Sequence, residues 1–391
     1  MRGPRDEIAQ RVDRLRRHLK EQDAGGAIIL DALNFAYLSG FHLDVDTWER
    51  PVALCIAADG AATALINELS SHAWDLAREE GLVVIDHVIV YREHSQAPES
   101  EPILAEWAAL VERTAGALGM TPVVGSDRPG AAERLLRAAP KMIDLEPAIR
   151  EMRRVKSPAE LEIFRRSGAI TDWAQERYRE LIRPGRYIQE VDHDIAKLLE
   201  VRAAEEFPHS HLKLMVISFA GVDTAYPHGM CGWPGRRIEN GQMVSTNVAF
   251  RIDGLGAENE RVWSVGTPDA RFRNHFEVAR EAQHVAVQTC LPGRRYREID
   301  AAAQQVIATA GFGPYSVHRS GHGVGLGLHE YPTDTAFNEE RMRNGEVMAV
   351  EPGIYVRGFG GFRHSDTLIV SAAGPEILTK FPKDLRSLTV Q

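Results

Sequence analysis

The chain has 391 residues, 44% of them apolar, and a formal net charge of −9, which is a globular composition long enough for a sizeable core. The acidic balance argues against a dedicated DNA- or RNA-binding protein, because such proteins need a basic face to neutralise phosphates. Three widely spaced cysteines argue against a disulfide framework. With no secretory segment and no apolar run of about 18 residues, the sequence predicts a cytoplasmic protein without a membrane span.

Helical and strand-like segments alternate through the first part of the chain. Apolar residues at helical spacing predict a helix over residues 8–19, which ends at Gly25-Gly26. Short apolar runs predict strands over residues 27–30, 52–57, 62–66 and 82–85, and a further helix is expected over residues 100–120. This alternation is typical of a small α/β domain, which we expect to cover residues 1–153.

A domain boundary is expected where a basic stretch gives way to a strong helix start. Ser157, Pro158 and Glu160 form the pattern of an N-cap, a first helical turn and a capping box. Further helices are expected over residues 188–204, 272–290 and 297–310, and strands over residues 214–219, 243–250, 262–265, 347–356 and 367–370. Residues 154–391 are therefore expected to form one α+β domain.

Acidic and histidine residues in the C-terminal part are the candidates for chemistry. His322 lies between glycines, which let the backbone approach closely and leave the ring in a pocket, although a turn with an incidental histidine has the same pattern. Glu351 follows an apolar strand, where burying a carboxylate is unfavourable unless it is used or paired. Glu258 and Glu260 either share one face of a strand or belong to a solvated turn.

Four stretches, taken in chain order, carry a family resemblance. They are NVAFRIDGLGAENERVW (residues 247–263), SGHGVGLGLHEYP (320–332), VMAVEPGIYV (347–356) and GGFRHSDTLIV (360–370). Together they resemble the superfamily of creatinase, aminopeptidase P and prolidase, which is peptidase family M24 with the pita-bread fold. The resemblance covers the whole chain. It implies an α+β pita-bread catalytic domain preceded by a smaller α/β domain of the creatinase type.

The metallopeptidases of this superfamily hold two metal ions with two Asp, one His and two Glu. The resemblance puts these ligands at Asn247, Glu258, His322, Glu351 and Ser365. A neutral amide and a hydroxyl thus replace two anionic ligands, whereas two hard cations need several negative charges to offset their dehydration. A two-metal centre is therefore not expected, and a single divalent ion held by Glu258, His322 and Glu351 stays open.

The loss of these ligands makes the chain similar to the metal-free, creatinase-like branch, which implies that no cofactor is needed. That branch has an asparagine at the position of Asn247 and a catalytic histidine that matches His228 in the segment GVDTAYPH. Its two functional glutamates match Glu260, directly before Arg261, and Glu351. The resemblance therefore implies His228, Glu260 and Glu351 as the catalytic residues.

Substrate binding is expected to involve Asn247, Arg261, His322 and His329, together with an arginine of the N-terminal domain. Arg50, in an Arg-Pro pair, matches a creatinase arginine that crosses a homodimer interface to the substrate carboxylate. A guanidinium suits that task because it binds carboxylates in a bidentate fork. A homodimer is implied, although an ordinary surface position would suit Arg50 equally well.

The match to creatinase is incomplete. The second carboxylate-binding arginine of creatinase is Thr333 here, and its last His-Asp pair is Ser365-Asp366, with His364 one place earlier. The HEYP segment is closer to aminopeptidase P and prolidase. The roles of Glu258, His364 and Ser365 stay open, and so does the identity of the substrate.

We accordingly expect a metal-independent, creatinase-like hydrolase that cleaves a C–N bond of a small carboxylate-bearing guanidino, amidine or amide compound. His228 would be the general acid and base, since histidine exchanges protons readily near neutral pH. Glu260 and Glu351 would hold the cationic head of the substrate. The alternatives are a metal-dependent Xaa-Pro aminopeptidase or dipeptidase with altered ligands, and a non-catalytic pita-bread binding protein.

Overall fold

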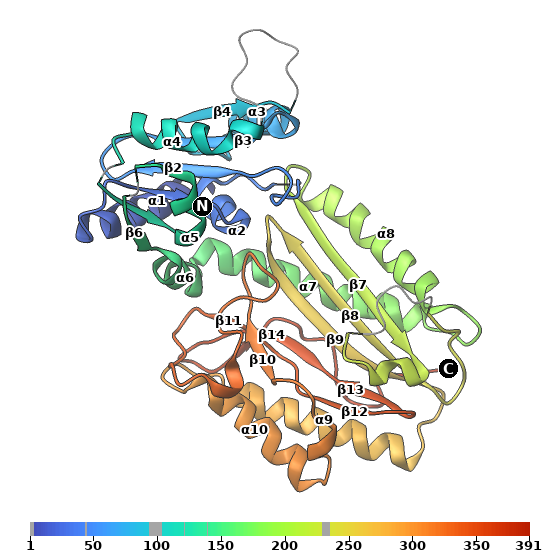
Figure 1. Ribbon diagram of the computed structural model, residues 1–391. Helices are drawn as coiled ribbons and strands as arrows, with labels where there is room; N and C mark the ends of the chain where they lie inside the picture. Colours follow the sequence, from blue (N-terminus) through green and yellow to red (C-terminus); the bar gives the residue numbers. More distant parts are fainter. Residues whose placement is uncertain (1–3, 44, 94–103, 121, 139, 229–234) are drawn as a thin grey trace. The chain divides into compact units, whose positions relative to one another are not determined.

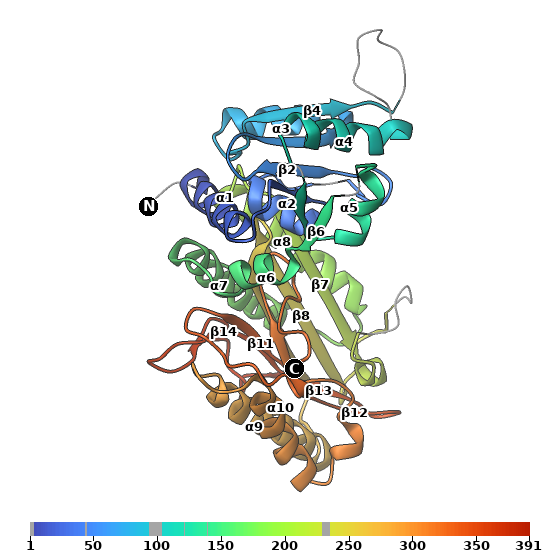
Figure 2. The same cartoon turned by 60° about the vertical axis from the view of Figure 1, so that its left-hand side comes forward.

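The structure is a computed structural model that describes residues 4–43, 45–93, 104–120, 122–138, 140–228 and 235–391. The chain divides into two units, Met1–Arg153 and Arg154–Gln391, each with a sheet and helices of its own (Figures 1 and 2). None of the helices in the described ranges is long and apolar enough to cross a membrane.

A six-stranded sheet in the order β4-β3-β2-β1-β5-β6 lies at the centre of the N-terminal unit. Its strands are β1 (Gly26–Ile29), β2 (Ala53–Ala57), β3 (Ala62–Asn67), β4 (His87–Tyr91), β5 (Val123–Ser126) and β6 (Lys141–Asp144). The pairs β1–β2 and β2–β3 are antiparallel, and β3–β4, β1–β5 and β5–β6 are parallel. Such parallel neighbours need crossover connections, and helices supply them.

The helices of this unit follow the strands in an α/β pattern. They are α1 (Pro4–Glu21), α2 (Ala32–Ser39), α3 (Ser71–Glu79), α4 (Trp107–Ala117), α5 (Pro129–Leu135) and α6 (Glu146–Arg154), with the short 3₁₀ helices η1 (Glu68–Ser70) and η2 (Leu104–Glu106). The start of the helix expected over residues 100–120 lies outside the described residues. An apolar core that includes Ile28, Leu65 and Val111 joins the sheet to α4.

The strand expected over residues 82–85 is wrong, because this apolar run is a buried loop. The Leu82 N–H closes the end of α3 by donating to the Ala77 carbonyl, and the Val84 N–H donates to the Ser39 carbonyl. The backbone groups of the run are thus used outside the sheet, and pairing with β3 begins only at His87.

The C-terminal unit is built on an eight-stranded sheet in the order β10-β11-β14-β9-β8-β7, with β15 beside β14 and β16 beside β9. Its strands are β7 (Leu212–Ala220), β8 (Met243–Ile252), β9 (Leu255–Val265), β10 (Gly321–Gly323), β11 (Val347–Val350), β14 (Ser365–Ile369), β15 (Glu376–Ile377) and β16 (Thr389–Val390). A separate two-stranded sheet pairs β12 (Gly353–Val356) with β13 (Gly360–Arg363).

Four long helices cover these sheets (Figure 1). They are α7 (Pro158–Leu181), α8 (Ile188–Glu206), α9 (Ala270–Thr289) and α10 (Tyr296–Thr309), with the short helices η3 (Gly221–Ala225), η4 (Gly313–Tyr315) and η5 (Thr335–Phe337). Helices α7 and α8 pack against β7, β8 and β9, whereas α9 packs against α10 and β11–β13. The expected capping box of Ser157 and Glu160 opens α7.

Side-chain alternation along the central strands decides which residues meet. Glu260 of β9 lies opposite Asn247 of β8 and Ser365 of β14. Cross-strand partners share a face of the sheet, so these three side chains lie together. Asn259 and Asp366 are partners on the other face, where Asn259 contacts Asp172 of α7 and Asp366 contacts Gln283 of α9. The sheet thus separates two sets of polar residues that are interleaved in the sequence.

The strand expected over residues 347–356 is in fact two strands of different sheets, β11 and β12. Pro352 lies between them and has no N–H to donate to a ladder, which accounts for the break. Glu351 occupies the junction, and its N–H donates to the Ser320 carbonyl at 2.8 Å. Glu351 thus lies outside both strands, and its backbone is held by the hydrogen bond to Ser320.

Candidate metal centre

Strands β8 and β9 present polar side chains together on one buried face. The Asn247 amide donates a short hydrogen bond to Glu260 Oε1. Glu258, two residues before Glu260, points to the same face and is 3% exposed. Burial and the neighbouring carboxylates raise the pKa of Glu260 to about 8, despite an adjacent guanidinium. Crowded, buried carboxylates of this kind favour a bound cation.

His322 reaches this face from β10, which lies unusually close to its neighbours. A Cβ atom on Gly321 would lie 2.5 Å from the Ala349 carbonyl oxygen, and one on Gly323 would lie 2.2 Å from the Tyr331 carbonyl oxygen. Only glycine allows so close an approach at both positions. The two glycines therefore allow the backbone around His322 to pack directly against Ala349 and Tyr331, and this packing fixes the position of the His322 ring.

The His322 ring turns Nε2 toward two carboxylates. Its Nδ1 donates to the Gly323 carbonyl at 3.0 Å, so the neutral ring carries its lone pair on Nε2. Nε2 lies 3.3 Å from Glu258 Oε1 and 3.5 Å from Glu351 Oε1, and it is buried without a hydrogen-bond partner among the described residues. Burial opposes a charge on the ring, but the two carboxylates raise the pKa of His322 to about 10. The two carboxylates thus favour a positive charge at Nε2, which is either the proton of the imidazolium or a metal ion in its place.

Two pairs of donor atoms, each of which includes His322 Nε2, are spaced to share a divalent ion. Metal–ligand bonds of about 2.0–2.2 Å at tetrahedral or octahedral angles place neighbouring ligand atoms about 3.0–3.5 Å apart. The separations of 3.3 and 3.5 Å around His322 Nε2 fall in that range. The bond from Nδ1 to a backbone carbonyl is also the one that orients metal-binding histidines. The pairs Glu258–His322 and His322–Glu351 therefore each suit an ion with mixed oxygen and imidazole ligands.

His329 stacks on His322, with ring centroids 3.7 Å apart and planes at 19°. Its donor atom lies within 4.8 Å of those of Glu258 and His322. Lone pairs of near-parallel rings run side by side, however, so both rings cannot bind one ion as they stand. Burial and the charge of His322 lower the pKa of His329 to about 4, and Arg319 donates to its Nδ1 at 3.1 Å. His329 is therefore neutral, with its proton on Nε2.

Arg363, the last residue of β13, crosses the site to Glu260. Its Nη2 donates to Glu260 Oε1 at 2.7 Å, its Nε contacts Oε2, and Nε lies 3.8 Å from Glu351 Oε2. These carboxylates outweigh burial and hold the pKa of Arg363 well above its usual value. Burial opposes ionisation of Glu351, but His322 and Arg363 lower its pKa below the ordinary value. Arg363 is thus part of the site, although the sequence analysis did not single it out.

Two more side chains beside Arg363 were also missed. Arg363 hydrogen-bonds the buried Tyr355 phenol, and Tyr355 Oη lies 2.8 Å from His318 Nε2. Nδ1 of His318 donates to the Arg319 carbonyl at 2.7 Å, so Nε2 accepts from Tyr355. Tyr355 stands in the EPGIY stretch and could have been found there. His318 lies outside the four stretches that carry the resemblance, and nothing in its neighbours indicates its place.

His228 lies at the exposed end of the turn that follows η3. Thr224 anchors this turn, because its buried hydroxyl donates to the Gly221 carbonyl at 2.7 Å and accepts from the Gly361 N–H at 2.9 Å. The segment is thus tied to the strand that carries Arg363. Burial lowers the pKa of His318, and the nearby His228 adds to this shift. Its expected role in proton transfer stays a prediction.

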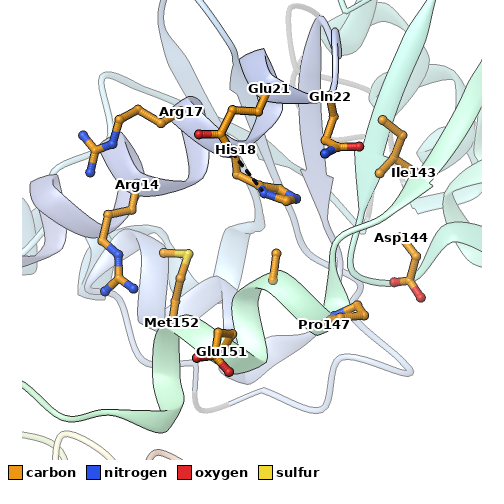
Figure 3. A pocket seen from close by; sticks show the side chains of 11 residues that line it. Arg14, Arg17, His18, Glu21, Gln22, Ile143, Asp144, Pro147, Glu151 and Met152 are labelled. Atoms are coloured by element: carbon orange, nitrogen blue, oxygen red, sulfur yellow. Dashed lines mark ion pairs between the residues drawn. The ribbon is translucent and has the colours of Figure 1, made fainter.

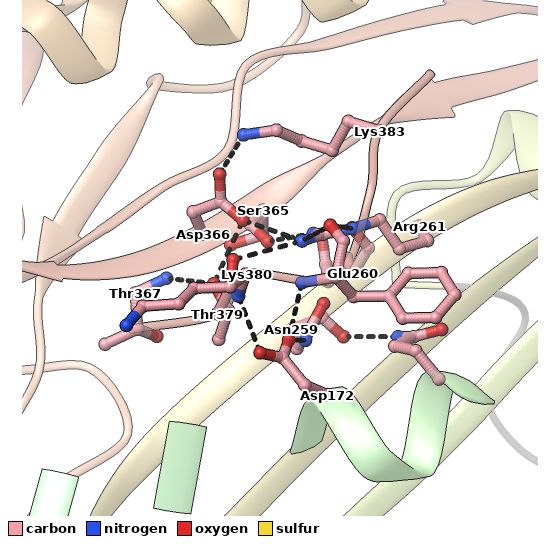
Figure 4. A network of polar contacts seen from close by, with 12 residues as sticks. Asp172, Asn259, Glu260, Arg261, Ser365, Asp366, Thr367, Thr379, Lys380 and Lys383 are labelled. Carbon is pink, nitrogen blue, oxygen red and sulfur yellow. Dashed lines mark hydrogen bonds and ion pairs between the residues drawn. The ribbon is translucent and has the colours of Figure 1, made fainter. Parts of the chain in front are cut away.

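Arg261 lies on the opposite face of β9 and is fully buried (Figure 4). Its guanidinium donates to the carbonyls of Phe381, Glu260 and Ser365, each at 2.8 Å, and to the Asp366 carboxylate at 2.9 Å. These contacts use its donors inside the protein. Arg261 therefore does not contact a substrate, although this was expected. It instead joins β9 to β14 and positions the two strands.

The two residues before Asp366, whose roles the sequence left open, point in opposite directions. Ser365 faces the site, and its hydroxyl lies 3.4 Å from Glu258 Oε1. His364 is fully buried against the edge of Phe276, with ring centroids 4.9 Å apart. Burial lowers the pKa of His364 well below its usual value. His364 is thus a neutral core residue outside the cluster.

Arg50 belongs to the N-terminal unit, where it pairs with acidic neighbours. Its guanidinium lies 2.5 Å from a Glu49 carboxylate oxygen and 2.7 Å from a Glu93 carboxylate oxygen. A substrate carboxylate would have to replace these partly exposed partners. The expected reach of Arg50 into a partner subunit, and the homodimer itself, stay predictions.

A hollow of about 720 Å³ in the N-terminal unit is lined by residues of α1 and α6 and by none of the site residues described above (Figure 3). Arg14, Arg17 and His18 face it, but so do Glu21 and Glu151, and His18 lies 4.0 Å from Glu21. Charges of both signs on an open surface select no particular ligand. We therefore look for the chemistry of the protein in the Glu258–His322–Glu351 cluster.

Comparison with known proteins shows the family to which the chain belongs. Residues 162–372, more than half of the chain, match the metallopeptidase family M24. The chain belongs to this family. Residues 11–155 match the creatinase/prolidase N-terminal domain, so both units of the M24 protein are accounted for.

Relatives across the family are peptidases by name. A probable dipeptidase PepE of Mycobacterium tuberculosis is 30% identical over 376 residues, covering 93% of this chain and 92% of the relative. An Xaa-Pro dipeptidase of Pyrococcus horikoshii is 33% identical over 241 residues, covering 62% of this chain and 67% of the relative. The crystal structure of the prolidase from Pyrococcus horikoshii superimposes with a TM-score of 0.80 at 27% identity, over 96% of this chain and 99% of that chain.

These matches confirm the superfamily and the pita-bread fold, and they correct the expected function. The family is one of metallopeptidases, so the metal-independent, creatinase-like hydrolase of guanidino or amidine compounds is wrong. The expectation that no cofactor is needed is wrong for the same reason. Asn247 and Ser365 do lack the expected charges, but Glu258 and Glu351 each remain within 3.5 Å of His322 Nε2. The chain is a hydrolase of the M24 family.

Proposed function

We propose that the protein is a metal-dependent peptidase that hydrolyses dipeptides, with Xaa-Pro dipeptides as the first substrates to test. The observation that carries this proposal is the convergence of Glu258 Oε1 and Glu351 Oε1 on the buried Nε2 of His322, at 3.3 and 3.5 Å. The names of the relatives, a probable dipeptidase and an Xaa-Pro dipeptidase, support the substrate class.

In this proposal Glu258, His322 and Glu351 hold a divalent ion. Such an ion, when bound, lowers the pKa of water and polarises a carbonyl, which is the chemistry that peptide hydrolysis needs. His329 contributes a hydrogen-bond donor, because its Nδ1 accepts from Arg319 and its Nε2 carries the proton. That N–H can bind a carbonyl or carboxylate oxygen of the dipeptide at the exposed edge of the cluster.

Metal dependence and substrate class are tested together. Purified protein is treated with a chelator, dialysed, and assayed on Xaa-Pro dipeptides, on Xaa-Ala dipeptides and on creatine, before and after Mn²⁺ or Co²⁺ is added. We expect peptide hydrolysis that disappears with the chelator and returns with the ion, and no turnover of creatine. Hydrolysis that persists in the fully chelated protein would overturn the proposal, and so would turnover of creatine alone.

His228 is proposed to protonate the leaving amine nitrogen when the peptide C–N bond breaks. Replacing His228 by Gln is expected to lower kcat about 100- to 10,000-fold, the usual contribution of a general acid or base. Bound metal per chain should not change, because His228 is not among the donors. Steady-state kinetics with parallel metal analysis checks this, and near-normal kcat in the variant would refute the role. His193→Gln, on α8, is the matched control and should leave kcat within twofold of wild type.

A further inference from the structure

Two cations lie on the same face of the sheet as Glu258. Alternation along β8 puts Arg251 on the face of Asn247, and ladder pairing sets Arg251 beside Lys213 of β7. The partner of Arg251 on β9 is Gly256, two residues before Glu258. Arg251 and Lys213 therefore occupy the row of residues next to the row that holds Glu258.

Within the described part of the chain, neither of these two cations forms an ion pair. Nη1 of Arg251 makes a long hydrogen bond, 3.5 Å, to the Leu326 carbonyl. Burial lowers the pKa of Arg251, although the nearby Glu330 and Glu258 oppose this shift. Burial and the charge of Arg251 likewise lower the pKa of Lys213. Like charges on neighbouring strands repel each other, so an anion bound between them would stabilise this part of the sheet.

The position of the two cations suits the free carboxylate of a dipeptide. Residue rows that share a face of a strand are about 7 Å apart, and one residue of extended peptide spans about 3.5 Å. A dipeptide whose scissile carbonyl lies beside Glu258 can therefore place its carboxylate within reach of the Arg251 guanidinium. A guanidinium binds a carboxylate in a bidentate fork, and the Lys213 ammonium adds a second charge.

We propose that Arg251 and Lys213 form the subsite for the C-terminal carboxylate of a dipeptide. The proposal rests on the peptidase function above and names the part of the substrate that these residues select. It makes the enzyme specific for peptides that end one residue after the scissile bond. The subsite is separate from Arg50 and Thr333, the positions at which creatinase has its carboxylate-binding arginines.

Substrates that differ only in this carboxylate test the subsite. The full chain with Mn²⁺ is assayed on an Xaa-Pro dipeptide and on the same dipeptide with a C-terminal amide. We expect kcat/KM to be about 10- to 100-fold lower for the amide, the usual contribution of a hydrogen bond to a charged group. Equal hydrolysis of acid and amide would overturn the inference while leaving the peptidase intact.

Variants of the two cations show whether they recognise the carboxylate. Arg251→Met is expected to lower kcat/KM for the acid by a similar factor, mainly through KM, and to leave that for the amide within twofold of wild type. Arg251→Lys should recover part of the loss. Lys213→Met should have a smaller effect, because Lys213 is exposed to solvent. Lys197→Met, at an exposed position of α8, is the control and should change neither value. An equal loss on acid and amide in Arg251→Met would refute the assignment.

Binding to the chelated protein gives a readout that does not depend on turnover. Isothermal titration of the full chain with the acid and with the amide is expected to show about tenfold tighter binding of the acid. Arg251→Met should remove most of this difference. Equal affinities, or no measurable binding of the acid, would overturn the inference. If the protein prefers the acid in binding but hydrolyses neither peptide with Mn²⁺, the proposed function fails and the carboxylate subsite stands.

Discussion

Replacing Glu258 by Gln is expected to lower kcat/KM for dipeptides on the order of a thousandfold and to weaken binding of the ion. The change keeps the shape of the side chain but removes an anionic oxygen that lies 3.3 Å from His322 Nε2. Metal ions contribute several kcal/mol to the stabilisation of a hydrolytic transition state, and each 1.36 kcal/mol corresponds to a tenfold change in rate. Steady-state kinetics and an isothermal Mn²⁺ titration measure the two losses.

A matched control separates this effect from a general loss of carboxylates. Glu277 is an exposed glutamate on α9 that pairs with Arg280, 2.7 Å away. Glu277→Gln is expected to leave both kcat/KM and Mn²⁺ affinity within twofold of wild type. If Glu258→Gln retained wild-type Mn²⁺ affinity, Glu258 could not be a ligand, and the assignment of the ion site would fail.

Much of the fold could be predicted from the sequence, because local pattern determines it. The helix start at Ser157 is visible as a capping box. A shared strand face for Glu258 and Glu260 was one of two alternatives that the sequence left open, and β9 decides for it. The failures came where tertiary contacts decide. The apolar run at residues 82–85 has the composition of a strand, but its N–H groups are taken by α3 and by Ser39. A different failure was local, because residues 347–356 were expected as one strand although Pro352, visible in the sequence, divides them into β11 and β12.

The chemistry of the site was less predictable, because it depends on distances between strands. The sequence shows that Asn247 and Ser365 are not anionic, and from this the loss of the two-metal centre was inferred, while a single ion at Glu258, His322 and Glu351 stayed open. It does not show that the donors of Glu258, His322 and Glu351 still converge. Arg363 illustrates the same limit, since its partner Glu260 is 103 residues away in the chain. Its pairing follows from the meeting of β9 with β13, and a single sequence carries no record of that.

The second large effect concerns stability and the face of β14 that points away from the site. Replacing Asp366 by Asn is expected to lower the free energy of unfolding by about 3–5 kcal/mol, as when one partner of a buried ion pair is removed. Asp366 is fully buried and accepts from Arg261, Gln283 and Thr379, each at 2.9 Å, and in close contact from Lys383 (Figure 4). An asparagine amide in its place would leave the Arg261 guanidinium without an anionic partner. The amide N–H₂ would also face the N–H and O–H donors that now bind the carboxylate.

Urea denaturation of the two proteins measures this difference, and the pH dependence identifies its origin. Burial opposes ionisation, but Arg261 and Lys383 lower the pKa of Asp366 from 3.8 to about 2. The native protein thus binds this proton less readily than the unfolded chain, so the stabilisation is complete above pH 4 and declines as the pH falls toward 2. The advantage of wild type over Asp366→Asn should shrink over that interval.

An exposed ion pair on the same unit gives the control for this experiment. Glu376 lies 2.7 Å from Arg165 at the surface, where solvent screens the interaction, so Glu376→Gln is expected to change stability by no more than about 1 kcal/mol. A loss that small for Asp366→Asn as well would mean that the buried network does not hold β14 against β9. The registry of Ser365 beside Glu260, on which the site depends, would then have to be fixed by the backbone ladder alone.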